Sequence, residues 1–299
     1  MKQLSNIKKE QGNLGRISME KIKKKIDIKR ITSALLGFPL VVLVLTLGNK
    51  YVVDVFLAII AAIAMQEYLN AISKDSKPIR WIGYISCILI ALIHIGPEKL
   101  DSLVIENFNM LIIPILLLIL FTTIIVTDMK INFKDISYTL FGIIYVITCI
   151  SFIAQIRGME NGRYLVWFAI IAAWGTDTFA YIIGKRFGKH KFSEVSPKKS
   201  IEGAVGGVVG AALLTALYCT ILRQQMGTDV KEICILSAIA AVAGLISMVG
   251  DLCASAIKRN YDIKDYGHLI PGHGGILDRF DSMIITAPII YYLSYYFLT

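Results

Sequence analysis

The chain has 299 residues, 56% of them hydrophobic and only 18% charged, which argues against a soluble globular domain and for a protein that contacts lipid. Its net charge of +9 lies mostly in residues 1–30, and a basic segment directly before an apolar run is typical of an orientation signal or of contact with anionic lipid, rather than of a nucleic-acid partner. The five cysteines are scattered singly through apolar segments, which implies neither a disulfide framework nor a structural zinc site.

Nine apolar segments follow the basic tail. Runs of this length can cross a hydrocarbon core about 30 Å thick, because a helix rises about 1.5 Å per residue. The pattern therefore predicts an all-α, polytopic membrane protein with about nine transmembrane helices. The predicted spans are 31–48, 51–70, 80–96, 108–126, 137–156, 163–184, 201–222, 232–257 and 282–298.

The distribution of basic residues predicts the orientation of these spans. With nine spans, 25 of the 31 Lys and Arg residues fall on the side that carries the N-terminus. An excess of this kind marks the cytoplasmic side. We therefore expect a multi-pass protein of the cytoplasmic membrane, with a basic cytoplasmic tail at 1–30 and a transmembrane domain at 31–299. The polar loops that carry chemistry lie in its C-terminal half, 163–299.

Asp177 is the first charged side chain whose position in a predicted span needs an explanation, because placing a charge inside a membrane costs at least about 2.5–3.5 kcal/mol of free energy. It lies in the predicted span 163–184 and shares a helical face with Trp174 and Tyr181. We interpret it as a functional carboxylate. The alternative is a hydrogen bond that holds two helices together.

A second carboxylate, Asp251, lies at the cytoplasmic end of the span 232–257 and shares a face with Ser255 and Lys258. A carboxylate, a hydroxyl and an ammonium on one face suit a metal ion together with a phosphate. The alternative is a helix that simply emerges into water, with Lys258 and Arg259 extending to the interface.

The segment 261–281 is glycine-rich around His273. Glycines at 272, 274 and 275 allow positive φ and a close approach of the backbone to a ligand, and backbone N–H groups exposed in this way can bind phosphate oxygens. Asp278 and Asp281 follow and could hold Mg²⁺. His268 and His273 are a weak zinc signal at a spacing of five, so we favour oxygen-ligated Mg²⁺ with the histidines as hydrogen-bonding groups.

The loop 185–200 contributes Lys198 and Lys199, whose point charges suit a polyphosphate. The alternative is a solvated basic loop that follows the topology rule. Carboxylates, lysines and glycines from three spans are thus expected to meet at the cytoplasmic face. This combination indicates Mg²⁺-dependent phosphoryl or nucleotidyl transfer at the membrane surface.

The same residues resemble a known signature. The segment 255–281 is similar, with the expected gaps, to the signature of the CDP-diacylglycerol synthases, or phosphatidate cytidylyltransferases. The stretches 174–184 and 196–203 resemble two upstream blocks of that family, except that Ser200 stands where threonine is more usual. Arg30 to Thr32 and Glu67-Tyr68 resemble weaker family features. The residues that carry the main match are Ser255, Lys258, Arg259, Lys264, Asp265, Gly267, Pro271, His273, Gly274, Gly275, Asp278, Arg279 and Asp281.

The resemblance implies a reaction in which CTP and phosphatidate give CDP-diacylglycerol and pyrophosphate. It implies Mg²⁺ as cofactor, with a monovalent cation such as K⁺ sharing the site. The expected partners are CTP, phosphatidate, membrane lipids and a second copy of the chain in a homodimer, and no nucleic acid. The whole segment 31–299 would then be a cytidylyltransferase domain.

The resemblance also implies roles for individual residues. The main metal carboxylates would be Asp251 and Asp278, supported by Asp177 and Asp281. Catalytic roles are also expected for Lys258 and Arg259, which with Arg279 would hold phosphatidate or pyrophosphate oxygens. The triphosphate would be neutralised by Lys198 and Lys199. The remaining expected substrate-binding residues are Ser200, Ser255, Lys264, Asp265, His273, Gly274 and Gly275.

Two alternatives remain open on the sequence. A secondary transporter would also carry intramembrane carboxylates, but it should place them near the bilayer midplane between repeated halves. Here they lie at predicted cytoplasmic ends, and no repeat is visible. Another lipid or polyprenol nucleotidyltransferase or phosphotransferase is the second alternative, although the Asp-Gly signature of the CDP-alcohol phosphotransferases is missing from the sequence.

Overall fold

The computed structural model describes residues 32, 33, 35, 37–95, 113–193, 196 and 199–298. All named secondary-structure elements of these residues are helices. The β-type contacts among them are two isolated antiparallel bridges, Lys191 with Ser200 and Ile270 with Gly274. The all-α prediction is therefore confirmed. The helical elements are α2 (Lys50–Ile72), α3 (Arg80–Ile95), α5 (Phe133–Gly142), η1 (Ile143–Thr148), α6 (Cys149–Gly158), α7 (Gly162–Ile170), η2 (Ile171–Gly175), α8 (Thr176–Phe187), α9 (Ile201–Ile221), α10 (Arg223–Met226), α11 (Val230–Asn260) and α12 (Leu277–Leu298).

Five helical stretches among the described residues are long and apolar enough to cross a membrane. They coincide with the second, fifth, sixth, seventh and eighth predicted spans. Three other predicted spans overlap shorter apolar helices, and the last lies within α12. The count of nine spans and the cytoplasmic N-terminus stay predictions, and the basic tail 1–30 lies outside the described residues. The five stretches are Lys50–Ile72, Phe133–Gly158, Gly162–Phe187, Ile201–Ile221 and Val230–Asn260.

Two of these stretches contain a π-helical turn that the sequence did not predict. The turn η1 joins α5 to α6, and η2 joins α7 to α8. π-turns inside α-helices are frequent at functional sites. Because η2 ends at Gly175, the irregular backbone lies two residues before Asp177.

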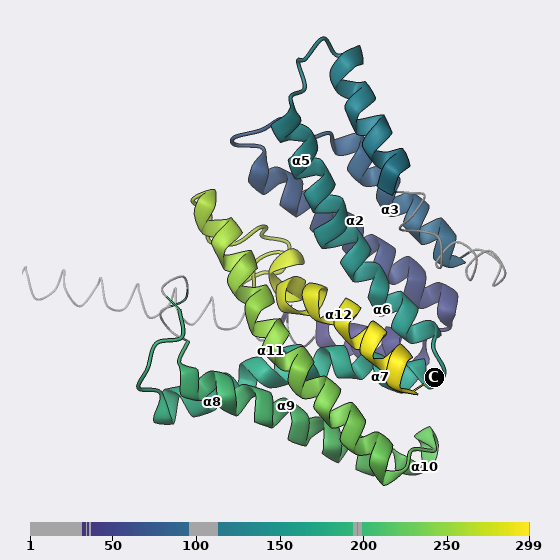
Figure 1. Cartoon of the computed structure of the whole chain (residues 1–299), viewed down its shortest axis with the longest axis vertical. Helices are drawn as coiled ribbons and strands as arrows, with labels where there is room; N and C mark the ends of the chain where they lie inside the picture. The colour runs from purple at the N-terminus through teal and green to yellow at the C-terminus, as the bar shows by residue number, and fades with distance from the viewer. Residues whose placement is uncertain are drawn as a thin grey trace, which may run out of the picture.

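Glycines of α9 set the close packing of α8 against it. A Cβ placed on Gly207 would lie 2.7 Å from the carbonyl oxygen of Thr176, and one on Gly203 would lie 2.7 Å from that of Ala180. These glycines therefore admit the α8 backbone itself. In Figure 1, α8 and α9 lie together at the lower end of the molecule and α11 crosses them. The three helices bring the residues around 177, 200 and 251 to one region.

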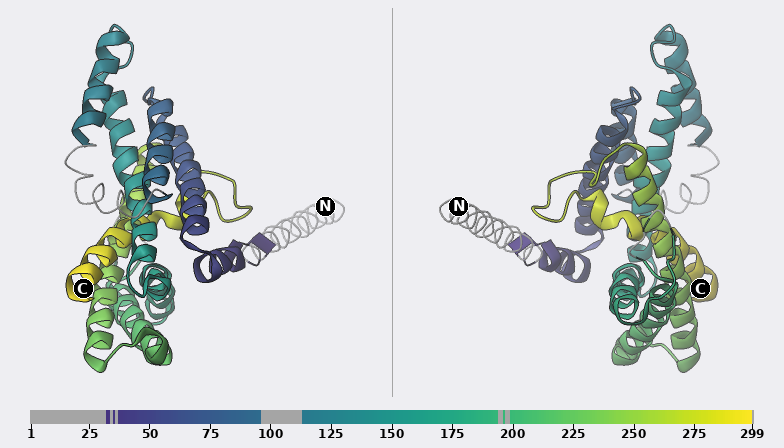
Figure 2. Two further views of the ribbon diagram at one scale, coloured as in Figure 1. Left: turned by 90° about the vertical axis from the view of Figure 1, so that its right-hand side faces the viewer. Right: turned by 90° about the vertical axis from the view of Figure 1, so that its left-hand side faces the viewer.

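The α11–α12 pair forms the other side of the site. The two helices pack against each other, and α12 also contacts α2 and α6. The polypeptide between them, residues 261–276, forms a loop that leaves the helical body on the same side as the helix Gly37–Leu47 (Figure 2). This loop contains the glycine-rich segment.

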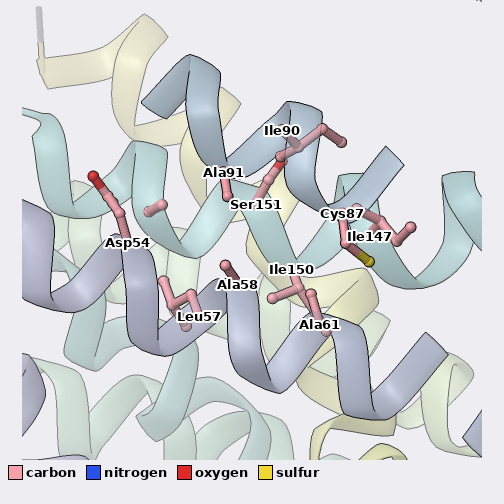
Figure 3. A pocket seen from close by; sticks show the side chains of 11 residues that line it. Asp54, Leu57, Ala58, Ala61, Cys87, Ile90, Ala91, Ile147, Ile150 and Ser151 are labelled. Carbon is pink, nitrogen blue, oxygen red and sulfur yellow. The ribbon is translucent and has the colours of Figure 1, made fainter. Parts of the chain in front are cut away.

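A small cavity between α2, α3 and the η1–α6 stretch is lined mainly by hydrocarbon (Figure 3). Its polar lining groups are Asp54, Cys87 and Ser151, and Asp54 is almost fully buried. The cavity shares no lining residue with the predicted site. We therefore treat it as part of the packing of the N-terminal helices.

Candidate active site

The first part of the site is a buried ion pair between α11 and α12. The ammonium of Lys258 donates to Oδ1 of Asp278 at 2.9 Å and lies 3.7 Å from Oδ2 of Asp281. The backbone N–H groups of Tyr266 and Gly275 donate to Oδ2 of Asp278 at 2.8 and 3.0 Å. Asp278 therefore joins α12 to α11 and to two points of the loop.

Tyr266 completes this buried group. Its ring lies 5.3 Å from the Lys258 ammonium, and its hydroxyl donates to the carbonyl oxygen of Ala254 at 3.2 Å. Burial raises the pKa of the Tyr266 phenol above its ordinary value, so the hydroxyl stays protonated and remains a donor. The first turn of the loop is thereby fixed to α11.

The second part of the site is a cluster around Lys199. Its ammonium lies 2.6 Å from Oδ2 of Asp251 and 3.8 Å from Oδ1 of Asp177. The three residues come from the loop after α8, from α11 and from α8 itself. The expectation that these separate segments meet is confirmed for Lys199, whereas Lys198 lies outside the described residues.

The loop that carries Lys199 is closed by its own hydrogen bonds. Ser200 is the N-cap of α9 and accepts from the N–H of Gly203 at 3.1 Å. Glu202 lies 2.6 Å from Nδ1 of His190, and the backbone N–H of Phe192 donates to Lys199 at 2.9 Å. Ser200 therefore has a structural task that the sequence did not assign. Its role in substrate binding stays a prediction.

The third part is an open polar cleft of about 440 Å³ formed by the loop and the start of α12. Its volume falls within the range of small-molecule sites, about 300–1,000 Å³. Gly272 and Gly274 have positive φ angles of 78° and 87°, as the sequence predicted. The φ angle of Gly275 is not positive, in contrast to the prediction. The residues that line the cleft are Lys264, Asp265, His268, Ile270, Gly272, His273, Gly274 and Arg279.

Two predicted residues lie apart from this cleft. Arg259 is exposed, and its guanidinium donates to the carbonyl oxygen of Ile263 at 3.3 Å. Ser255 is partly buried on α11, one turn after Asp251. Neither of these two described residues belongs to the cleft lining. Their assignment to substrate binding or catalysis stays a prediction.

Two residues at the site come from the N-terminal part of the chain. The Ser33 hydroxyl lies 2.9 Å from Nδ1 of His273 and 3.1 Å from the carbonyl oxygen of Pro271. Glu67 of α2 accepts from the N–H groups of Ile276 and Leu277 at 3.1 and 2.8 Å. The sequence signal for Glu67 is the pair Glu67-Tyr68, which resembles a weaker family feature. Ser33 gave no such signal.

The carboxylates differ in how well they suit a metal ion. Among the described residues, no group of three or more His, Cys, Asp or Glu side chains gathers as a ready-made metal site. Asp177 and Asp251 have side chains 43% and 26% exposed, so their oxygens can turn to a ligand. The Asp278 side chain is only 1% exposed and already accepts three hydrogen bonds. The oxygen donors around Lys199 therefore fit Mg²⁺ better.

Comparison with known proteins places the chain in a family. A model of the cytidylyltransferase family matches residues 28–297. The chain belongs to the cytidylyltransferase family. It is 30% identical to the phosphatidate cytidylyltransferase of Bacillus subtilis (strain 168) over 273 residues, which cover 90% of this chain and 98% of the relative. It is 32% identical to the enzyme of the same name from Staphylococcus aureus (strain COL) over 262 residues, which cover 84% and 93%.

The three parts of the site offer a cytidylyltransferase three different kinds of group. The cleft presents the cationic side chains of Lys264 and Arg279 to solvent-borne anions. The Lys199 cluster offers partly exposed carboxylates, and the Lys258 pair is a buried support. The family match covers the residues of all three parts.

Proposed function

We propose that this cytidylyltransferase transfers the cytidylyl group of CTP to phosphatidate and so forms CDP-diacylglycerol and pyrophosphate. The observation that carries the proposal is the alignment with phosphatidate cytidylyltransferases over most of both chains. The polar cleft beside apolar helices supports it, because the reaction joins a water-soluble nucleotide to a lipid.

The chemistry asks mainly for positioning and charge neutralisation. A phosphate oxygen of phosphatidate forms a bond to the α-phosphorus of CTP. The bond from that phosphorus to the oxygen bridging to the β-phosphate breaks, and pyrophosphate leaves with the electron pair. Because the attacking phosphate is already an anion, no general base is required. Holding two anions together in reactive geometry is therefore the larger task of the protein.

The cationic groups of the cleft suit this task. Lys264 and Arg279 lie on opposite sides of the His273 turn in sequence and line the same cleft. Arg279 can bind two phosphate oxygens through its planar guanidinium, and Lys264 supplies a point charge. The positive-φ backbone at Gly272 and Gly274 lines the cleft without side chains of its own, so an anion can approach the main chain closely.

The metal remains part of the proposal. Asp251 and Asp177 would hold Mg²⁺, and Asp278 and Asp281 would be supporting carboxylates. We propose K⁺ as a neighbouring monovalent cation. Bound Mg²⁺ would neutralise charge on the triphosphate. The Lys199 ammonium lies between the carboxylates of Asp251 and Asp177. We propose that Lys199 turns to the triphosphate when the cation binds.

The proposal includes a side of the membrane and an assembly. We place the cleft and both carboxylate clusters at the cytoplasmic face of the cell membrane, where CTP is available, and keep the acyl chains of phosphatidate in the bilayer. We also propose a homodimer. The support for sidedness is the asymmetry of Lys and Arg along the sequence.

A direct assay tests the proposal. Purified protein in mixed micelles is incubated with labelled CTP, phosphatidate and Mg²⁺, and the lipid product is separated and counted. We expect labelled CDP-diacylglycerol and an equal amount of pyrophosphate. Absence of lipid product from folded protein, or equal product when diacylglycerol replaces phosphatidate, would refute the proposed reaction.

A further inference from the structure

The carboxylate of Glu67, a residue of α2, caps the N-terminus of α12. The first N–H groups of a helix have no partner within the helix and are usually capped by a nearby Ser, Thr, Asp or Asn. At the start of α12 the neighbouring residues are Gly275 and Ile276, which cannot supply a side-chain cap. The two oxygens of Glu67 instead accept from the N–H groups of Ile276 and Leu277.

This cap comes from 209 residues away and is buried. Glu67 is only 6% exposed, so its carboxylate is held by the protein rather than by water. The adjacent N–H, of Gly275, donates to Asp278. Two carboxylates thus share three successive N–H groups at the point where the glycine turn becomes α12, and a negative charge there is favoured by the helix dipole.

Two glycines make room for the Glu67 side chain. A Cβ placed on Gly267 or on Gly275 would overlap the Glu67 carboxyl group. Neither glycine has a positive φ, so their backbone conformations do not require glycine. The reason for glycine at both positions is therefore the space that Glu67 occupies. Gly272 and Gly274, in contrast, have the left-handed backbone that favours glycine.

We propose that Glu67 is a positioning residue that clamps the loop to α12, and that Gly267 and Gly275 lack side chains to admit its carboxylate rather than a ligand. Through Ile276 and Leu277 the clamp sets the direction of the first turn of α12, which carries Arg279 and Asp278. The effect of the clamp on catalysis rests on the proposed function, whereas the clamp itself does not.

The first experiment measures the clamp without substrate. Glu67→Gln keeps the shape of the side chain but turns an –NH₂ group toward one of two N–H donors. Hydrogen exchange of the full-length protein in micelles, read by mass spectrometry on peptides covering 274–281, should quicken at least about tenfold in this variant. Glu67→Asp keeps the charge but withdraws both acceptor oxygens by one methylene, so exchange should quicken in this variant as well. Glu160→Gln, at an exposed turn, is the matched control and should match wild type.

The second experiment tests the glycines by rescue. Gly267→Ala should lower kcat per folded molecule at least about tenfold, because its methyl group meets the Glu67 carboxylate. Glu67→Asp withdraws the carboxylate by one methylene, so the double variant should recover at least about threefold over Gly267→Ala. Coupling of this size is typical of residues in contact. A side chain that clashed with a ligand would instead raise KM for CTP and would not be rescued.

The outcomes separate the two proposals. If wild type makes no CDP-diacylglycerol but exchange quickens in Glu67→Gln, the reaction is wrong and the clamp stands. Unchanged exchange at 274–281 in folded Glu67→Gln overturns the clamp. Failure of Glu67→Asp to rescue a folded Gly267→Ala overturns the assignment of the glycines. If Gly267→Ala does not fold, recovery of folded protein in the double variant with Glu67→Asp supports the assignment of the glycines, and no recovery overturns it.

Discussion

At the scale of single residues, two lysines hold two pairs of aspartates in different surroundings. Lys199 lies between Asp177 and Asp251 at a partly exposed site, whereas Lys258 lies 2.9 Å from Asp278 with only 11% of its side chain exposed. Exposed carboxylates can exchange a lysine for a cation or substrate. A buried pair is instead a fixed support, because opening it leaves an uncompensated charge.

The first prediction concerns Asp251. Replacing it with Asn removes the charge that lies 2.6 Å from the Lys199 ammonium. We expect kcat for CDP-diacylglycerol formation to fall at least about 100-fold, the effect usual for loss of an electrostatic group at a reacting centre. Labelled product per folded molecule is the measurement. Asp262→Asn on the exposed side of the loop is the control and should keep wild-type activity, and full activity of Asp251→Asn would remove this residue from the site.

The second prediction contrasts two lysines. Lys258→Met should lower the free energy of unfolding by about 3 kcal/mol, at the lower end for a broken buried pair because two backbone N–H groups still donate to Asp278. Thermal unfolding in micelles should show a clearly lower Tm. Lys264→Met, at an exposed cleft position, should keep its Tm and raise KM for CTP. Equal Tm for both variants would contradict the supporting role of Lys258.

At the scale of elements, the glycines of α9 decide where Asp177 lies. The α8 backbone rests directly on α9, and η2 precedes Asp177 by two residues. Small residues that let two backbones approach closely are a common basis of helix packing in membranes. The position of Asp177 relative to Lys199 therefore depends on the absence of side chains one helix away.

The third prediction tests this packing with Gly207→Leu. A Cβ at this position would already lie 2.7 Å from the carbonyl oxygen of Thr176, so a larger side chain forces α8 and α9 apart. Overpacking of this kind costs about 1–3 kcal/mol. We expect a lower Tm together with a loss of activity as Asp177 moves from Lys199. Gly158→Ala, with open space around its Cβ position, is the control, and a wild-type Tm for Gly207→Leu would show that the helices are less tightly apposed.

Elements also show what the sequence could and could not predict. The apolar runs predicted α9 and α11 within a few residues, and the shared face of Asp251 and Lys258 follows from helical spacing. The meeting of Asp251 with Lys199 was predictable because the Lys and Arg pattern predicts the same side of the membrane for both. The pairing of Lys258 with Asp278 was not, since nothing in the sequence distinguishes a metal ligand from a buried ion-pair partner.

The contact between Glu67 and α12 was beyond sequence reasoning for another reason. A helix cap is normally sought within a few residues of the helix start, and here it comes from another helix. The sequence predicted backbone freedom at Gly275, but the structure explains this glycine by the space around it. A local sequence pattern therefore predicts the backbone conformation of a segment better than it predicts which residue of another helix will contact that segment.

At the scale of the whole molecule, the long helix α11 separates the segment before it from the loop of the polar cleft after it. α11 has 31 residues and is therefore about 46 Å long, more than the hydrocarbon thickness of a bilayer. Its start follows α10, and its end leads into the loop of the polar cleft. Residues before and after α11 are thus expected on opposite sides of the membrane.

The fourth prediction uses this geometry. In a variant without native cysteines, Gln225→Cys and Asn260→Cys, both at exposed positions, are labelled with a membrane-impermeant maleimide. In intact cells we expect label on residue 225 only, and on residue 260 only after the membrane is opened. The reverse pattern would place the cleft outside the cell, and label on both in intact cells would show that α11 does not cross.

The clamp between Glu67 and Leu277 has a consequence for how the protein is made. A ribosome delivers α2 to the membrane long before it has synthesised the start of α12, so the Glu67 carboxylate must wait for more than two hundred residues of translation before its N–H donors exist. During that interval the nascent chain carries an unmatched acid among apolar helices. Formation of α12 therefore supplies the donors that Glu67 lacks until then, and a chain terminated before residue 276 would keep this acid without them.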